Sequence, residues 1–227
     1  MNFETLYAGF GAPIAAFDCG AKCAPYNEGG IPFCCDTRHA VPTVYLAEWD
    51  YLRKHTDLWH PWQAETPQET AELQAETPDG QMLVACLGHR ACQRGFRSLT
   101  CRAFPFFPYL NSQAEFLGLS YYWAYADRCW VANNLQVVSE VYVRQFVAAY
   151  ERVFAYFPQE RENFMVHCAY TRETFIRRRR RIPLLHRNGL TYQISPRTER
   201  LHPVRPEALP KYGPYKIAAW LSFPDEV

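Results

Sequence analysis

The chain has 227 residues, of which 48% are hydrophobic and 21% charged, a balance that supports the buried core of one medium-sized domain and excludes general disorder. Its formal net charge is +1, so overall electrostatics do not favour nucleic acid, and nucleic-acid binding is not expected. No apolar run reaches the roughly 18 residues that a membrane-spanning helix needs, and the acidic opening lacks the features of a signal peptide. The sequence therefore predicts a soluble, cytoplasmic protein with no membrane segment.

The first predicted elements are a helix and a strand on either side of a polar connection. Apolar residues at three-residue steps predict a helix over residues 43–54, with Thr43 as its N-cap. Residues 62–80 are acidic and polar, so we expect a solvated connection there. Residues 82–85 are a short apolar run, which predicts a strand that leads directly into Cys86.

The second half of the chain has the clearest helical pattern. Apolar residues recur at three- and four-residue steps over residues 135–157, and Pro158 is expected to end this helix. A second helix is predicted over residues 160–180. The Asn188-Gly189 pair between two apolar runs then predicts a β-hairpin.

These elements predict an α+β fold: a small irregular domain with a cysteine-rich, metal-binding N-terminal half, a long amphipathic helix and a C-terminal β-hairpin. We expect residues 1–132 to form the cysteine-cluster region and residues 133–227 to form a helical scaffold that ends in the hairpin and a proline-rich tail. The two parts are expected to form one compact unit, with the helix over 135–157 packing against the N-terminal half. Trp220 and Leu221 are expected to pack the tail onto the body.

The cysteines are the most informative feature of the sequence. Seven of the nine fall within the first 101 residues, with the spacing C-x3-C-x10-C-C, then 50 residues, then C-x5-C-x8-C. Glycines, prolines and an asparagine lie among the first four, and such residues let a backbone turn tightly around a small object. Clustered thiolates favour zinc or iron–sulfur clusters.

Two other interpretations of the cysteines are weaker. Disulfides are typical of secreted domains, but nine is an odd number, and the adjacent Cys34 and Cys35 are poorly placed to pair with each other or with two crowded partners. Scattered buried cysteines explain one or two positions but not two clusters. Metal binding is therefore the favoured hypothesis.

Eight thiols would be enough for two four-thiolate sites, and one site with spare thiols is the alternative. His89 is a further candidate ligand, although a histidine beside cysteines is more often a hydrogen-bond donor to the ligands or a surface residue. Cys168 is expected to be a buried bystander, but His167 beside it keeps a role as ligand open. The spacing selects neither a 4Fe–4S cluster nor zinc. The predicted ligands are Cys19, Cys23, Cys34, Cys35, Cys86, Cys92, Cys101 and Cys129.

The cysteine region resembles a known family. The elements Cys19-Gly20-x-x-Cys23, Cys34-Cys35, the separated Cys86 and Cys92, and Cys101-Arg102-Ala103-Phe104-Pro105 are similar to the YkgJ-type cysteine-cluster family, a zinc- or iron-chelating domain, and to the cysteine region of flagellin lysine N-methylases. Ser98 stands where that family commonly has proline, and an insertion at residues 24–30 loosens the first group. The resemblance covers residues 19–108 and implies a metal-chelating cysteine cluster without implying a particular reaction.

No glycine-rich phosphate loop, nucleophile elbow or dinucleotide fingerprint is present, so catalytic residues are unknown. We expect a structural or electron-transfer role with a protein or redox partner that the sequence does not identify. A cluster-dependent enzyme, such as a protein lysine N-methylase-like methyltransferase, is the alternative.

A run of five arginines is the second feature that carries a functional hypothesis. It supports an RNA- or protein-binding adaptor as a further alternative. A solvated helix end, neutralised by Glu160, Glu162 and Glu173, is the favoured interpretation of the run. The five residues are Arg177, Arg178, Arg179, Arg180 and Arg181.

Overall fold

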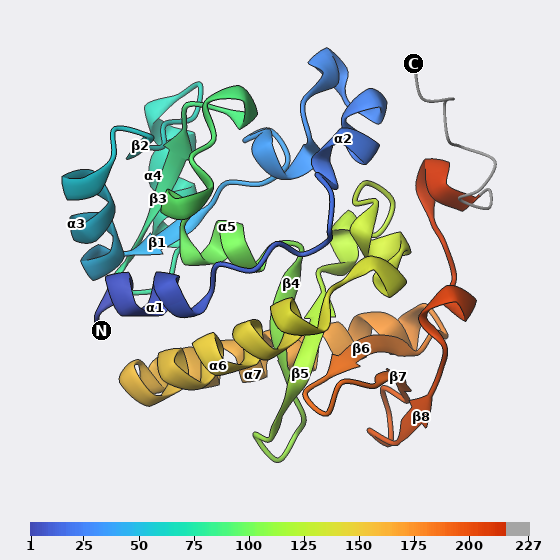
Figure 1. Ribbon diagram of the computed structural model, residues 1–227. Helices are drawn as coiled ribbons and strands as arrows, with labels where there is room; N and C mark the ends of the chain where they lie inside the picture. The colour runs from blue at the N-terminus through green and yellow to red at the C-terminus, as the bar shows by residue number, and fades with distance from the viewer. Residues whose placement is uncertain (217–227) are drawn as a thin grey trace.

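The structure is a computed structural model, and it describes residues 1–216; Trp220 and Leu221 lie outside the described residues. The chain forms an α+β fold with two antiparallel sheets, as the sequence predicts (Figure 1). The helices of the described part are α1 (Phe3–Gly9), α2 (Gly20–Cys23), α3 (Leu46–His55), α4 (Pro67–Ala75), α5 (Leu99–Ala103), α6 (Glu140–Tyr156) and α7 (Pro158–Arg177). The strands are β1 (Thr43–Tyr45), β2 (Trp59–Pro61), β3 (Gln81–Cys86), β4 (Phe106–Leu110), β5 (Phe116–Tyr121), β6 (Ile182–His186), β7 (Thr191–Ile194) and β8 (Leu201–Pro203).

The smaller sheet positions the second cysteine group. Its strand order is β1-β3-β2, with Thr43 opposite Leu83 and Trp59 opposite Cys86. The strand predicted over residues 82–85 is thus confirmed as the central strand, β3, and its last residue is Cys86. This pairing fixes the backbone of Cys86 in a hydrogen-bonded ladder, whereas the other predicted ligands lie in short helices, turns and loops.

The larger sheet is a five-stranded meander in the order β4-β5-β6-β7-β8. The predicted hairpin is confirmed, since β6 and β7 pair across a turn that contains Asn188 and Gly189. Gly118 of β5 has a φ of 146°, and a Cβ there would overlap the carbonyl oxygen of Leu185 on β6. Glycine is therefore required where these two strands approach each other.

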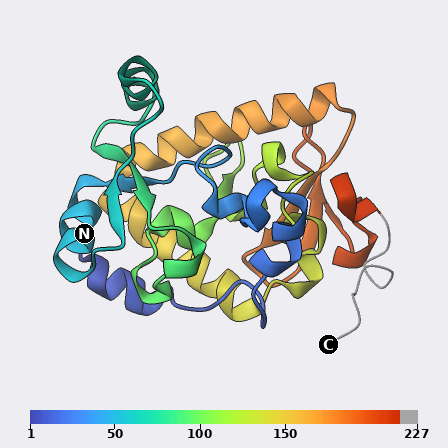
Figure 2. The same cartoon turned by 90° about the horizontal axis from the view of Figure 1, so that it is seen from above.

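Helices α6 and α7 contact each other and this sheet, α6 on β5 and α7 on β4, and α7 runs across most of the molecule when it is seen from above (Figure 2). The Ser139 side chain accepts a hydrogen bond from the Tyr142 amide and caps α6, while Pro158 separates the two helices as predicted. The predicted packing of this helix on the N-terminal half is observed, because the Phe10 ring lies 5.5 Å from that of Tyr142 and 6.0 Å from that of Phe146.

Three predicted boundaries are wrong for identifiable reasons. Thr43 does not cap α3; it pairs in β1, and Tyr45 is the N-cap. Residues 62–80 are exposed as expected but include α4, which Thr66 caps with its side chain. The predicted helix over 135–157 begins only at Glu140, because a separate 3-10 turn (Leu135–Val137) precedes it.

Within residues 1–216, none of the helices combines the length and the apolar character that crossing a bilayer requires.

Candidate functional site

Apart from Cys86 at the end of β3, the predicted ligands lie on short helices, turns and loops. Cys34 and Cys35 belong to one 3-10 turn (Phe33–Cys35), and Cys92 directly follows another (His89–Ala91). Cys101 lies in α5, whose N-cap Ser98 accepts a hydrogen bond from the Cys101 amide. Such short turns bring thiols together because none of them has to continue through a long regular element.

Six of the eight predicted ligands line one cavity of about 670 Å³. His89 lines it as well, so this histidine lies where the sequence suggested. The six cysteines on the cavity wall are Cys19, Cys34, Cys35, Cys86, Cys92 and Cys101. The structure therefore brings both cysteine groups, which are 50 residues apart in the chain, to a single place.

The other two predicted ligands, Cys23 and Cys129, are not among the residues that line this cavity. Each affects the protonation of thiols that face the cavity: the pKa of Cys19 is raised to about 11 by burial and by Cys23, and Cys129 contributes to the raised pKa of Cys34. Burial likewise raises the pKa of Cys129 itself to about 12. All eight thiols thus belong to one electrostatically connected group.

Within that group the thiols are held mainly in their neutral form. Burial raises the pKa of Cys101 to about 12, and Cys35 and Cys92 add to the effect. The Sγ atoms of Cys34 and Cys35 lie 3.9 Å apart, and hydrogen bonding between them raises the pKa of Cys34 and lowers that of Cys35. Several thiolates cannot form so close together unless positive charge compensates them.

Arg97 supplies positive charge to the site, a role that was not predicted from the sequence. Its Nε donates to Cys92 Sγ at 3.4 Å; burial tends to lower its pKa, but Cys101 and Cys92 outweigh this and raise it. The feature of the sequence that could have identified Arg97 is its position four residues before Cys101. Arg94 also lines the cavity and pairs with Asp18 at 3.4 Å, which links the loop of Cys92 to that of Cys19.

Arg102, which follows Cys101, has a structural role instead. Its guanidinium donates to three backbone carbonyls, those of Arg97 at 2.9 Å, Phe10 at 2.6 Å and Gly95 at 2.6 Å. It is 8% exposed, and its Cζ lies 4.1 Å from the centroid of the Tyr7 ring. Arg102 therefore joins the end of α1 to the loop that carries Cys92.

A buried carboxylate supports the same region. Glu48 of α3 is fully buried and accepts hydrogen bonds from the Tyr7 hydroxyl, from the Leu99 amide at 2.6 Å and from the Tyr45 amide at 3.3 Å. Burial raises its pKa to about 7, although these donors act in the opposite direction. Glu48 thereby ties α1 and α3 to the start of α5, which carries Cys101.

The remaining cysteine, Cys168, behaves as the buried bystander that the sequence predicts. It is completely buried in α7, its Sγ accepts from the Leu110 amide at 3.2 Å, and the residue faces β4. All nine cysteines lie within the described residues and all are free thiols, so no disulfide joins them. Within residues 1–216, no group of three or more Cys, His, Asp or Glu side chains already surrounds a single point as one metal ion requires.

The opposite end of the cavity is formed by α7 and was not predicted. Glu160, Asn163, Phe164 and His167 line it, at the spacing that places residues on one face of a helix. Their helical spacing is visible in the sequence, but polar residues at such spacing usually mark a solvent-facing surface. Only the fold reveals that this face borders a cavity.

A segment near the C-terminal end of the described chain holds the loop of Cys129. Lys211 Nζ donates to the Asn133 carbonyl at 2.8 Å, the Tyr212 amide donates to Asn133 Oδ1 at 2.5 Å, and the Tyr215 hydroxyl donates to the Arg128 carbonyl at 3.0 Å. Residues 211–215 therefore close over the segment that carries the eighth predicted ligand.

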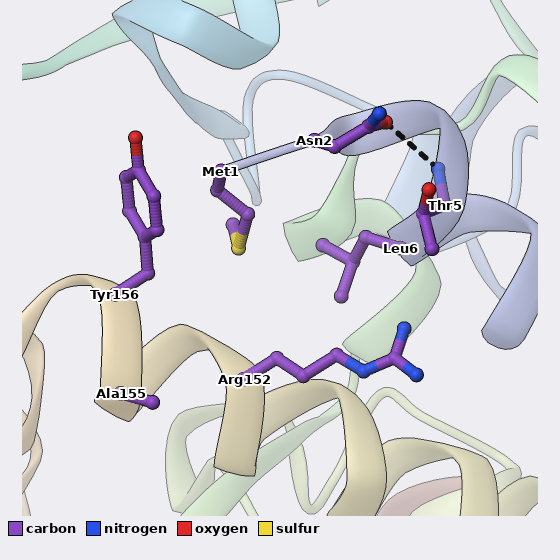
Figure 3. Close-up of a pocket in the computed structure, with 7 residues that line it drawn as sticks. All are labelled: Met1, Asn2, Thr5, Leu6, Arg152, Ala155 and Tyr156. Atoms are coloured by element: carbon purple, nitrogen blue, oxygen red, sulfur yellow. Dashed lines mark hydrogen bonds between the residues drawn. The ribbon is translucent and has the colours of Figure 1, made fainter.

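A second hollow, of about 400 Å³, lies between α1 and α6 (Figure 3). Figure 3 shows the Arg152 side chain running beneath Leu6, while Asn2 hydrogen-bonds the Thr5 amide at 3.0 Å. The wall is mostly apolar and contains no cysteine, histidine or carboxylate, so this hollow is not the candidate site.

The arginine run is the solvated helix end that the sequence predicts, because α7 ends at Arg177 and all five arginines are exposed. Within residues 1–216, none of the five arginines forms an ion pair, so the expected neutralisation by Glu160, Glu162 and Glu173 is wrong. Arg178 instead stacks on Trp123, with its Cζ 4.3 Å from the ring centroid, and Arg180 stacks on Tyr212 at 4.6 Å.

Comparison with known proteins found no matching family model, no matching curated protein and no matching solved structure. The resemblance of residues 19–108 to the cysteine-cluster family therefore stays a prediction.

Proposed function

We propose that this protein holds a thiolate-bound metal centre, in preference an iron–sulfur cluster, with a structural or electron-transfer role. One observation carries the proposal: six cysteines from five separate segments line the same cavity, and Cys23 and Cys129 interact electrostatically with them. Neutral thiols do not explain why eight cysteines lie around one cavity, whereas metal binding explains it.

The size of the cavity favours a cluster over a single zinc ion. Four thiolates on one zinc lie about 2.3 Å from it, so their sulfurs leave no open space between them. The cysteines here line a space of about 670 Å³, which has room for a four-iron cluster whose irons each bind a different thiolate.

The residues that would hold the group are the six cysteines of the wall, with Cys23 and Cys129 as reserve ligands. An iron–sulfur cluster supplies one-electron transfer when it is bound. Arg97 would offset part of the negative charge of the thiolates, and its hydrogen bond to Cys92 Sγ is of the kind that tunes cluster potentials. The surrounding aromatic residues Phe104, Phe106 and Tyr122 would limit access of water to the cavity.

The experiment is anaerobic purification, followed by an absorption spectrum and by zinc, iron and acid-labile sulfide analysis on the same sample. We expect a brown protein with broad absorption near ~400 nm and with iron and sulfide in equal amounts. A colourless protein with stoichiometric zinc would replace the cluster by a structural zinc site. Protein that contains neither metal overturns the proposal.

A matched pair of variants tests the assignment of ligands. Cys101→Ser removes a thiol from the cavity wall, whereas Cys168→Ser changes a buried thiol that faces β4. We expect the first variant to lose most of its bound metal and the second to keep it. Equal metal contents in the two variants would contradict the assignment.

A further inference from the structure

The α7 end of the cavity contains a buried carboxylate with no cationic partner. Glu160 is 7% exposed and accepts hydrogen bonds from Tyr45 Oη at 2.8 Å, Gln81 Nε2 at 3.0 Å and Asn163 Nδ2 at 2.9 Å. All three donors are neutral, and within residues 1–216 Glu160 forms no ion pair. Burial of a carboxylate without a compensating cation is costly, so this arrangement has a stability cost that needs a reason.

The geometry of these hydrogen bonds leaves room for one more donor. Oε1 of Glu160 accepts from both amides, while Oε2 accepts only from Tyr45. A carboxylate offers about four acceptor positions, two on each oxygen. One position on Oε2 is therefore free at the edge of the cavity that Glu160 lines.

A second polar group at this end also lacks a partner. Nε2 of His167 is buried and forms no hydrogen bond within residues 1–216. The imidazole packs edge-on against the rings of Phe107 at 4.5 Å and Tyr122 at 5.2 Å. Burial lowers the pKa of His167, so the ring is neutral near pH 7 and offers an acceptor nitrogen. Buried polar atoms without partners are rare in native proteins, and a ligand that the structure does not contain is a common reason for one.

The rest of the wall is aromatic. Tyr45, Tyr122, Tyr150 and Phe164 line this end of the cavity. The faces of aromatic rings attract cations, and an enclosure of several such rings is typical of sites for organic ammonium groups.

The two ends of the cavity differ in charge. Arg97 hydrogen-bonds Cys92 and Arg94 pairs with Asp18, so both arginines that line the cavity contact the cysteine-bearing segments. Glu160 on α7 contacts only neutral donors. A ligand beside Glu160 therefore meets a free carboxylate position and aromatic faces, and no cation pairs with that carboxylate within residues 1–216.

We propose that the α7 end of the cavity binds a small-molecule organic cation, an ammonium or guanidinium compound. Its charge pairs with Glu160 Oε2, and its carbon skeleton packs among the aromatic rings. The cavity volume, about 670 Å³ in total, is within the range of small-molecule sites. This inference does not depend on the metal centre, because none of the residues that carry it is a predicted metal ligand.

The test is calorimetric titration of the full-length protein with three ligands of matched size: n-butylammonium, n-butanol and butyrate. We expect n-butylammonium to bind at least tenfold more tightly than n-butanol, and butyrate not to bind measurably. Because this series uses the unaltered protein, it decides the question even if a variant fails to fold. Equal affinity for the amine and the alcohol, or a preference for butyrate, overturns the proposal.

Two glutamates on the same helix provide matched variants. Glu160→Gln removes the buried carboxylate, while Glu162→Gln changes an exposed carboxylate two residues away. We expect the first variant to weaken binding of n-butylammonium at least tenfold and the second to leave it unchanged; equal effects of the two variants contradict a site at Glu160. Metal analysis of the same samples separates this proposal from that of the metal centre. Amine binding by protein without metal would support the cation site, and metal without amine binding would overturn the cation site but not the metal centre.

Discussion

Replacement of Arg102 by lysine tests how the loop of Cys92 is attached to the body of the protein. The guanidinium donates three hydrogen bonds to carbonyls: that of Phe10 at the end of α1, and those of Gly95 and Arg97 in the loop after Cys92. Arg102→Lys keeps the positive charge, but a single ammonium group can reach only one of these three oxygens. The other two carbonyls then lose charged donors in a partly buried setting.

The expected cost follows from this count. Hydrogen bonds to charged groups contribute about 1.5–3 kcal/mol each, so the loss of two costs about 3–6 kcal/mol. Part of the cation–π contact with Tyr7 is kept, since an ammonium also interacts with the ring face. A loss of this size is a large fraction of the roughly 5–15 kcal/mol by which most domains are stable.

The assay is urea unfolding monitored by circular dichroism, with Arg90→Lys as the control because Arg90 is exposed and lies in the same loop. The control should remain within about 0.5 kcal/mol of the parent protein. Metal content is measured on every sample, so that a loss of metal is not mistaken for the loss of these hydrogen bonds. If Arg102→Lys destabilises the protein by less than about 1 kcal/mol, the three carbonyl contacts do not hold the loop and our reasoning is refuted.

Three further predictions concern the scaffold. The pKa of Glu48 is raised from 4.5 in the unfolded chain to about 7 in the folded protein, so the unfolded state loses its proton first as the pH rises. The free energy of unfolding therefore falls by about 3 kcal/mol between about pH 4.5 and pH 7. Glu48→Gln should lack this part of the pH dependence in unfolding experiments at several pH values, and an unchanged slope would contradict the assignment. Gly118→Ala should destabilise the protein by about 3 kcal/mol, because the new Cβ overlaps the Leu185 carbonyl, whereas Gly95→Ala meets open space and should change the melting temperature little; similar melting temperatures would refute the clash. Ser139→Ala should cost about 1 kcal/mol by removal of the cap of α6, and Ser139→Asp should restore most of it, unless the cap contributes nothing.

The fold was predictable from the sequence where the pattern alone determines the structure. The periodic apolar residues of α6, the break at Pro158 and the Asn188-Gly189 turn each act through local geometry, and each prediction is confirmed. Thr43 shows where local reasoning fails. Its helix-capping propensity is outweighed by pairing with Leu83, a residue 40 positions away that only the tertiary fold brings close.

The candidate site was predictable at its cysteine end only. Cysteine is rare and chemically distinctive, so clusters in the sequence pointed directly to the residues that the fold brings to one cavity. Glu160 and His167 gave no such signal, because glutamate and histidine on a helix are common at solvent-facing positions. Their burial depends on β1, β3 and the 3-10 turns, which no periodicity in α7 encodes.

The contacts of Lys211, Tyr212 and Tyr215 with residues 128–134 have a consequence for the order of events during synthesis. Domains form from the N-terminus as the chain emerges, and the first seven candidate ligands are all made within the first 101 residues. The segment that holds the Cys129 loop in place is made more than 80 residues later. The thiols are therefore exposed to the cell on a partly finished protein, and the pocket can take its final form only after residues 211–215 have been made. Loading of a cofactor, and any protection of the thiols from oxidation until then, must be matched to that delay.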